Sequence, residues 1–281
     1  MRFIPVLSLT LLVGLLTAPI PMCRVRFSRS GTLFLAAYTP YGFALAADGA
    51  SLAPDGKVRQ AQKMFQVGKS GAIAFVGYPT VQDSGDRKEE VDAVAIGTKW
   101  AAAHPDADIR IANTEINSII ASSWTRFFAT RDPGEAAGQM RLRVICIGLA
   151  DGAPVAIRTK YFVPEGSGKS TRTEVLASME PARPDLPWIL ELGKWKTAEE
   201  LTAGKSPAFR SFKSEPPMQK FRLSRGNGLS LQDFVRTFDV ILRATESEEG
   251  KQFDTDPAVV GPPNRFALIE PVKGFSWTSP R

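Results

Sequence analysis

Histidine and cysteine are scarce in this chain of 281 residues, which contains one histidine, His104, and two cysteines, Cys23 and Cys146. A single histidine excludes most metal centres built from imidazole ligands, and it leaves a Ser-His-Asp triad only one candidate base. Two cysteines cannot form a disulfide framework, and Cys146 lies in an alternating pattern typical of a buried strand. Because His104 directly precedes a proline, we expect it to cap the end of a helix.

Clusters of basic residues are also absent, although the chain carries 35 Lys and Arg against 29 Asp and Glu, a net charge of +6. A nucleic-acid-binding surface requires basic residues and aromatics gathered on one element, and here the positive charge is scattered. Residues 166–170, Gly-Ser-Gly-Lys-Ser, lack the first glycine of a phosphate-binding loop. We therefore expect no nucleic-acid partner, no cofactor and no metal ion.

The most continuous apolar run lies at the start of the chain. Arg2 precedes an apolar stretch over residues 3–16, which is too short to span a bilayer comfortably, and small residues follow it. This pattern predicts a secretory signal peptide, with residues 1–31 removed as signal peptide and propeptide, and no stable membrane span in the mature protein. We expect secretion, or export to the periplasm or envelope; if Met22 is the true start, the protein is instead cytoplasmic.

Turn signals separate short apolar runs in the next part of the chain. The runs predict two β-hairpins, one of residues 33–37 with 43–47 and one of residues 63–67 with 72–76. Because the runs are continuously apolar, we expect their strands to be covered on both faces.

Three segments have the apolar spacing of amphipathic helices. The first covers residues 91–104, and the second begins at Asn113 as N-cap and ends near Ala129. The third begins at Ser230, which forms a predicted capping box with Asp233.

Alternating patterns return after the second helix. Residues 140–149 and 155–163 predict a third hairpin, and residues 266–270 predict a strand followed by a turn and a last short segment at 275–277. The order of strands, two helices, strands, helix and strand suits helices packed on both faces of antiparallel sheets, an α+β fold.

The region from residue 164 to residue 220 is rich in Pro, Gly, Ser and Lys. It predicts loop or lid structure, apart from one strand at residues 186–192. We find no internal repeat and no linker that would divide the chain into two domains.

The Gly31-Thr32 bond could produce a catalytic residue. Cleavage there would leave the threonine hydroxyl and a free α-amine on one residue, and an amine with a pKa of about 8 can accept the hydroxyl proton. A nearby ammonium would lower that pKa, a carboxylate would hold the ammonium, and a glycine N–H would receive the oxyanion. This chemistry needs no histidine.

Three later residues supply those groups in order: Asp48, Lys63 and Gly77. With Gly31-Thr32 and the apolar runs around them, they resemble proteasome β subunits and their bacterial relatives, which are N-terminal threonine hydrolases with a four-layer αββα sandwich fold. Asp48 lies sixteen positions after Thr32, as in the family, and Lys63 comes one residue early. The resemblance implies that Thr32 is nucleophile and base, Asp48 and Lys63 the charged pair, and Gly77 the oxyanion donor.

The later part of the chain departs from the family pattern. The family has a serine in a Gly-Ser-Gly turn, and the counterpart here, around Gly193, lacks it. The family's Asp-x-x-Ser-Gly motif is reduced to an acid and a glycine, Asp256 and Gly261, so Asp256 is a further site candidate. By this resemblance, residues 32–281 form one domain with an insertion at about 164–220.

Two functions follow from the sequence. The first is a threonine-type amidohydrolase or peptidase that cleaves peptide or amide bonds through an acyl-enzyme on Thr32. The alternative is a catalytically degenerate proteasome-fold protein that serves as a binding or assembly module. Because the family assembles into rings, the resemblance also implies a homo-oligomer.

Overall fold

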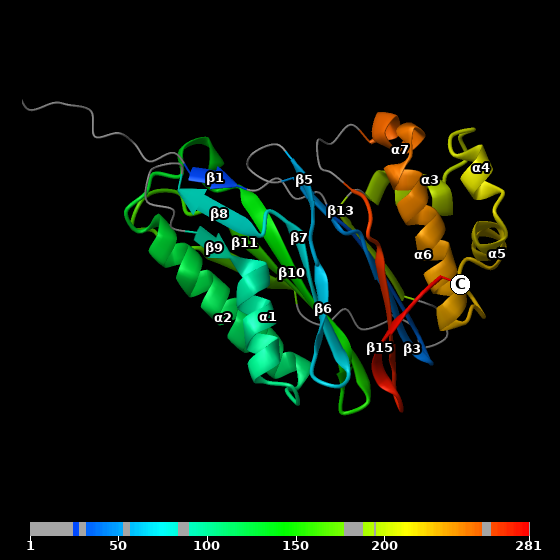
Figure 1. Ribbon diagram of the computed structural model, residues 1–281, viewed down its shortest axis with the longest axis horizontal. Coiled ribbons are helices and arrows are strands. Elements are labelled where there is room, and N and C mark those ends of the chain that lie inside the picture. The colour runs from blue at the N-terminus through cyan, green and yellow to red at the C-terminus, as the bar shows by residue number, and fades with distance from the viewer. Residues whose placement is uncertain are drawn as a thin grey trace, which may run out of the picture.

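The computed structural model of the chain is shown in Figure 1. The structure describes residues 25–27, 32–52, 57–83, 90–176, 188–193, 195–254 and 260–280. The expected signal segment up to residue 24, Gly31 and Asp256 lie outside these ranges. None of the helices within them has the length and hydropathy needed to cross a bilayer.

Two five-stranded antiparallel sheets form the centre of the molecule. In spatial order the first sheet consists of β13 (Trp188–Gly193), β2 (Leu33–Thr39), β3 (Gly42–Ala47), β14 (Arg265–Glu270) and β15 (Gly274–Thr278). The second consists of β12 (Arg172–Leu176), β11 (Ala153–Phe162), β10 (Met140–Ala150), β7 (Gly71–Gly77) and β6 (Met64–Val67).

Smaller sheets and the helices complete the fold. A three-stranded sheet holds β1 (Val25–Phe27), β8 (Thr80–Asp83) and β9 (Glu90–Asp92), and β4 (Ala50–Leu52) pairs with β5 (Val58–Gln60). The helices are α1 (Ala93–Ala103), α2 (Ile109–Phe128), the short η1 (Gly134–Ala136), α3 (Trp195–Thr202), α4 (Arg210–Lys213), α5 (Pro216–Ser224), α6 (Leu231–Glu246) and α7 (Glu248–Phe253). Figure 1 shows α1 and α2 on one side of the strands and α3 to α7 on the other.

Alternation along β10 explains how the apolar residues are divided between cores. Val144 and Cys146 belong to the core that α1 and α2 share with the second sheet. Ile145 and Ile147 belong to a different core, which contains residues of both sheets. Since successive side chains of a strand point to opposite faces, one strand serves two cores, as the sequence pattern predicted. A third core joins the first sheet to α3, α5 and α6.

The structure confirms an α+β fold of antiparallel sheets and helices, together with the predicted hairpins and most helices. Ser230 caps α6, and both hydrogen bonds of the capping box with Asp233 are present. His104 caps α1, where its N–H donates to the carbonyls of Trp100 and Ala101. Cys146 is completely buried.

The predicted start of the second helix is wrong. Asp108, not Asn113, is the N-cap of α2, and its carboxylate accepts from the N–H of Arg110 at 2.7 Å. Asn113 lies inside the helix and accepts from the amide of Asn117 at 2.8 Å. The first turn is fixed by the burial of Ile109 in the core, which a search for the best local cap does not reveal.

The prediction of loop structure at 164–220 is also wrong, because much of this region forms β12, α3, α4 and α5. Ala198 and Leu201 of α3, and Met218 and Phe221 of α5, are buried in one core with α6. Each helix is too short to be stable alone, so packing against α6 rather than local propensity determines it. The expected strand at 186–192 is present as β13.

Candidate active site

Asp48 and Lys63 meet in a buried ion pair. The Nζ of Lys63 donates to Oδ2 of Asp48 at 2.8 Å, and the two side chains are 3% and 0% exposed, respectively. Asp48 directly follows β3 of the first sheet, and Lys63 directly precedes β6 of the second. The pair therefore joins the two sheets at one end.

Three backbone N–H groups also donate to the Asp48 carboxylate. Leu33 donates to Oδ1 at 2.8 Å, and Ala50 and Gly261 donate to Oδ2 at 3.3 and 3.4 Å. A buried carboxylate needs such donors because it has lost its water. Since Leu33 is the residue after Thr32, Asp48 also fixes the backbone at the start of β2.

Burial and charge act in opposite directions on this pair. Burial raises the pKa of Asp48, against the ammonium of Lys63 and the N–H donors, which lower it. Burial lowers the pKa of Lys63, against the charge and hydrogen bond of Asp48, which raise it. Neither charge would be stable in this position without the other.

Thr32 is 2% exposed and lies immediately before β2. Phe34 and Ala36 of β2 face the core between the sheets, so alternation places the Thr32 side chain on that side as well. Gly193 approaches the Thr32 carbonyl so closely that a Cβ at position 193 would lie 1.4 Å from its oxygen. With φ of +97°, position 193 requires glycine for both reasons.

Gly77 ends β7, the strand next to β6. The N–H of Phe75 donates to the carbonyl of Lys63 at 3.0 Å, so Gly77 lies two residues beyond the partner of Lys63. Its φ is +106°, and a Cβ there would lie 2.4 Å from the carbonyl oxygen of Arg141. The glycine is thus required by the backbone and lies at the same end of the second sheet as Lys63.

Of the residues that the sequence singled out, Asp48 and Lys63 are in direct contact, and Thr32 adjoins them through Leu33. Gly77 lies on the neighbouring strand, and Asp256 is outside the described residues. The sequence did not indicate that Ala50 and Gly261 bind the carboxylate. Gly261 carried one signal, the remaining glycine of a family motif.

Glu246, at the end of α6, was not predicted as part of this region. Its carboxylate accepts from the side-chain amide of Asn264 at 2.7 Å. Burial raises its pKa, and the negative charge of Asp48 adds to this effect. A second half-buried acid therefore lies within electrostatic range of the ion pair, and its sequence context gave no signal of this.

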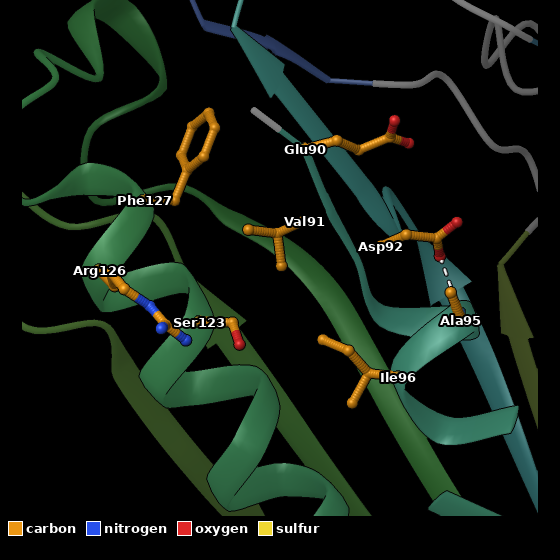
Figure 2. Close-up of a pocket in the computed structure, with 8 residues that line it drawn as sticks. All are labelled: Glu90, Val91, Asp92, Ala95, Ile96, Ser123, Arg126 and Phe127. Carbon is orange, nitrogen blue, oxygen red and sulfur yellow. Dashed lines mark hydrogen bonds between the residues drawn. The ribbon is translucent and has the colours of Figure 1, made fainter. Parts of the chain in front are cut away.

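A separate hollow lies away from the Asp48–Lys63 pair. Figure 2 shows a pocket between the start of α1 and the end of α2. Its volume is about 860 Å³. It is lined by Glu90, Val91, Asp92, Ala95, Ile96, Ser123, Arg126 and Phe127. Asp92 is occupied as the N-cap of α1, since its Oδ1 accepts from the N–H of Ala95 at 3.0 Å. No residue of the candidate active site lines this pocket.

Metal ligands do not gather in the described ranges, where no group of three or more His, Cys, Asp and Glu side chains could hold an ion. At the Asp48–Lys63 pair, a carboxylate holds a lysine ammonium and also accepts from the N–H of Leu33, the residue after Thr32.

No family model and no curated protein matches the chain. Two solved structures of Anbu from Hyphomicrobium sp. strain MC1 are similar to it. One, a Gly-1 mutant, is 14% identical in sequence and has a TM-score of 0.45. The similarity covers 88% of this chain and 85% of the Anbu chain. The other is 12% identical in sequence and has a TM-score of 0.46, and the similarity covers 88% of this chain and 87% of the Anbu chain.

Proposed function

We propose that this protein is an N-terminal threonine hydrolase that cleaves peptide or amide bonds through an acyl-enzyme on Thr32. The observation that carries the proposal is the buried Asp48–Lys63 pair, whose carboxylate also binds the N–H of Leu33. One carboxylate thus holds both a lysine ammonium and the backbone of Leu33, which supports a role for Lys63 at the proposed chain end, Thr32.

The proposed reaction begins after residues 1–31 are removed. The free α-amine of Thr32 takes the hydroxyl proton, and the oxygen attacks the scissile carbonyl. The Lys63 ammonium lowers the pKa of the amine and so keeps it neutral, while Asp48 holds Lys63 in place. The Gly77 N–H stabilises the oxyanion. The leaving amine departs with the proton, and water then hydrolyses the ester.

The proposal includes a fold and a maturation path. The two central sheets with their helices would be the αββα sandwich of this class, in one domain over residues 32–281, with residues 164–220 as an insertion. Residues 1–31 would be a signal peptide and propeptide, which would lead to secretion or export. The three cores support the fold assignment, since each lies between different elements.

The test is the N-terminus of protein purified from its own host. We expect the wild-type chain to begin at Thr32 and the Thr32→Ala variant to retain earlier residues and lose activity by about 10⁴-fold or more. Thr39→Ala is the matched control, because Thr39 is a buried threonine at the other end of β2. An active wild-type chain that retains residues before Thr32 would exclude this mechanism.

The second function is a non-catalytic binding or assembly module with the same fold. The lack of the family's serine beside Gly193 favours it, since the glycine remains in contact with Thr32 without that hydroxyl. A peptide boronate that forms a covalent bond to Thr32 would rule this alternative out. Absence of both labelling and processing would support it.

A further inference from the structure

Two arginines interrupt the apolar lining between the sheets, Arg143 on β10 and Arg158 on β11. Ile145 and Ile147 of β10 and Ala156 of β11 belong to the core that contains residues of both sheets. Because side chains alternate along a strand, Arg143 and Arg158 point to the same side as these three residues. Both arginines are half-buried.

Neither guanidinium has an acidic partner among the described residues. The Nε–H of each is buried and without an acceptor there. On the same face, Lys160 and Arg172 both pair with Glu174, at 3.3 and 3.5 Å. That single acid is thus shared by two other cations. Burial, and next the charge of Arg158, lower the pKa of Arg143, as expected for two positive charges on one face of the sheet.

The register of the second sheet places these arginines near the proposed active site. The backbone carbonyl of Lys63 accepts a hydrogen bond from the N–H of Phe75, and Phe75 lies opposite Val144 on β10. Arg143 is the residue before Val144 and lies opposite the residue before Gly77. Since strands are about 4.8 Å apart, the Arg143 backbone is two strands, or about 10 Å, from that of Lys63. This distance corresponds to about three residues of an extended substrate.

We propose that Arg143 and Arg158 bind a carboxylate, namely an acidic side chain of the substrate within three residues of the scissile bond. Guanidinium groups bind carboxylates through paired, charge-assisted hydrogen bonds, and a bound carboxylate would remove the repulsion between the two arginines. The place of this side chain in a substrate rests on the proposed function, whereas the carboxylate site itself does not.

Binding is tested first, without catalysis, on the full chain. The probes are N-acetylglutamate α-amide and N-acetylglutamine α-amide, which differ only in the side-chain carboxylate. We expect the glutamate probe to raise Tm by about 2 °C or more at saturation, and the glutamine probe to leave Tm unchanged. Arg143→Gln and Arg158→Gln should abolish the shift. Arg110→Gln is the control, because Arg110 lies on α2 and pairs with Asp151.

Specificity is tested with fluorogenic peptides that carry Glu, Gln or Lys at each of the three positions before the scissile bond. We expect Glu at one position to raise kcat/KM by about tenfold or more over Gln, mainly through KM. Arg143→Gln should remove this preference, so that the Glu and Gln peptides are cleaved with similar kcat/KM. Without ligand, Arg143→Gln should also not lower Tm, since it removes a repulsion.

The two readouts separate the inference from the proposed function. Binding that depends on Arg143 in a protein that cleaves no peptide would sustain the carboxylate site and reject the hydrolase. Cleavage with no preference for Glu and no thermal shift would overturn the carboxylate site and leave the hydrolase. A lower Tm in ligand-free Arg143→Gln would show a structural role and would also overturn it.

Discussion

Two strongly buried ion pairs in the described part of the chain differ in what surrounds the acid. Asp83 pairs with Arg131 at 3.2 Å, and Arg131 also donates to the carbonyl of Phe127 and lies over its ring. That pair joins β8 to the end of α2. Asp48 instead gathers Lys63 and three backbone N–H groups. The comparison teaches that the Asp83–Arg131 pair links β8 to the residues after α2, whereas the Asp48 carboxylate binds groups at the starts of β2, β4 and β6 and at Gly261.

The largest loss of stability should come from removing the Asp48 carboxylate. Asp48→Ala would remove the buried carboxylate that Lys63 and three backbone N–H groups share, and we expect it to lower the free energy of unfolding by about 3–5 kcal/mol. Asp83→Ala should cost less, about 2 kcal/mol, because Arg131 keeps its contacts with Phe127. Urea denaturation of both variants measures the difference. Equal losses would show that the two acids play the same part.

Removing the cations should separate stability from catalysis. Lys63→Met keeps the length of the side chain and leaves the Asp48 carboxylate with its backbone donors. We expect it to cost less stability than Asp48→Ala and to lower kcat by about 10²-fold or more, because the ammonium is lost from the site. Arg131→Met should lower stability without changing kcat. Wild-type kcat in folded Lys63→Met would contradict the role given to the lysine.

The pH profile of hydrolysis should report the Lys63 proton. In the proposed mechanism the charged lysine is the active form, and burial lowers the pKa of Lys63 below the ordinary 10.5. As pH rises through this lowered pKa, the ammonium is lost, and kcat/KM should fall at a pH below 10.5. Steady-state assays across the alkaline range, with Arg131→Met as control, measure this limb. An alkaline limb unchanged in Lys63→Arg would assign it to another group.

The smallest expected effect is a change in the rate at which the buried Cys146 thiol is chemically labelled. Burial raises the pKa of its thiol, so the native protein should react very slowly with iodoacetamide. In a Cys23→Ser background, labelling then measures transient opening of the fold. We expect Asp48→Ala to accelerate it more than Asp83→Ala does. Rapid labelling of the unmutated fold would show that the core around β10 opens readily.

Much of the fold was predictable because its signals are local. The hairpins have turn residues between apolar runs, and Ser230 and Asp233 lie three residues apart. The helices α3 to α5 were missed because their stability comes from packing on α6, which no window of sequence contains. Asp108 was missed in favour of Asn113 for the same reason, since the burial of Ile109 decides where α2 begins.

The candidate site was predictable only in part. The order and spacing of Thr32, Asp48 and Lys63 carried enough signal to group them. Asp48 and Lys63, which form the ion pair, are only fifteen positions apart in the sequence. The Gly261 donor lies 213 positions from Asp48, and no pattern in the sequence predicts such a contact. That Arg143 and Arg158 lie on one face, without an acidic partner among the described residues, likewise follows from strand pairing and contacts that no local pattern contains.

The hydrogen bond between Gly261 and Asp48 has a consequence for the timing of biosynthesis. A ribosome releases the first β-hairpin long before it reaches position 261, so the Asp48 carboxylate lacks its full set of donors until that residue has been made. The close approach of Gly193 to Thr32 likewise waits for the middle of the chain. Thr32, Asp48 and Lys63 can thus reach their final positions only after residue 261 has been made.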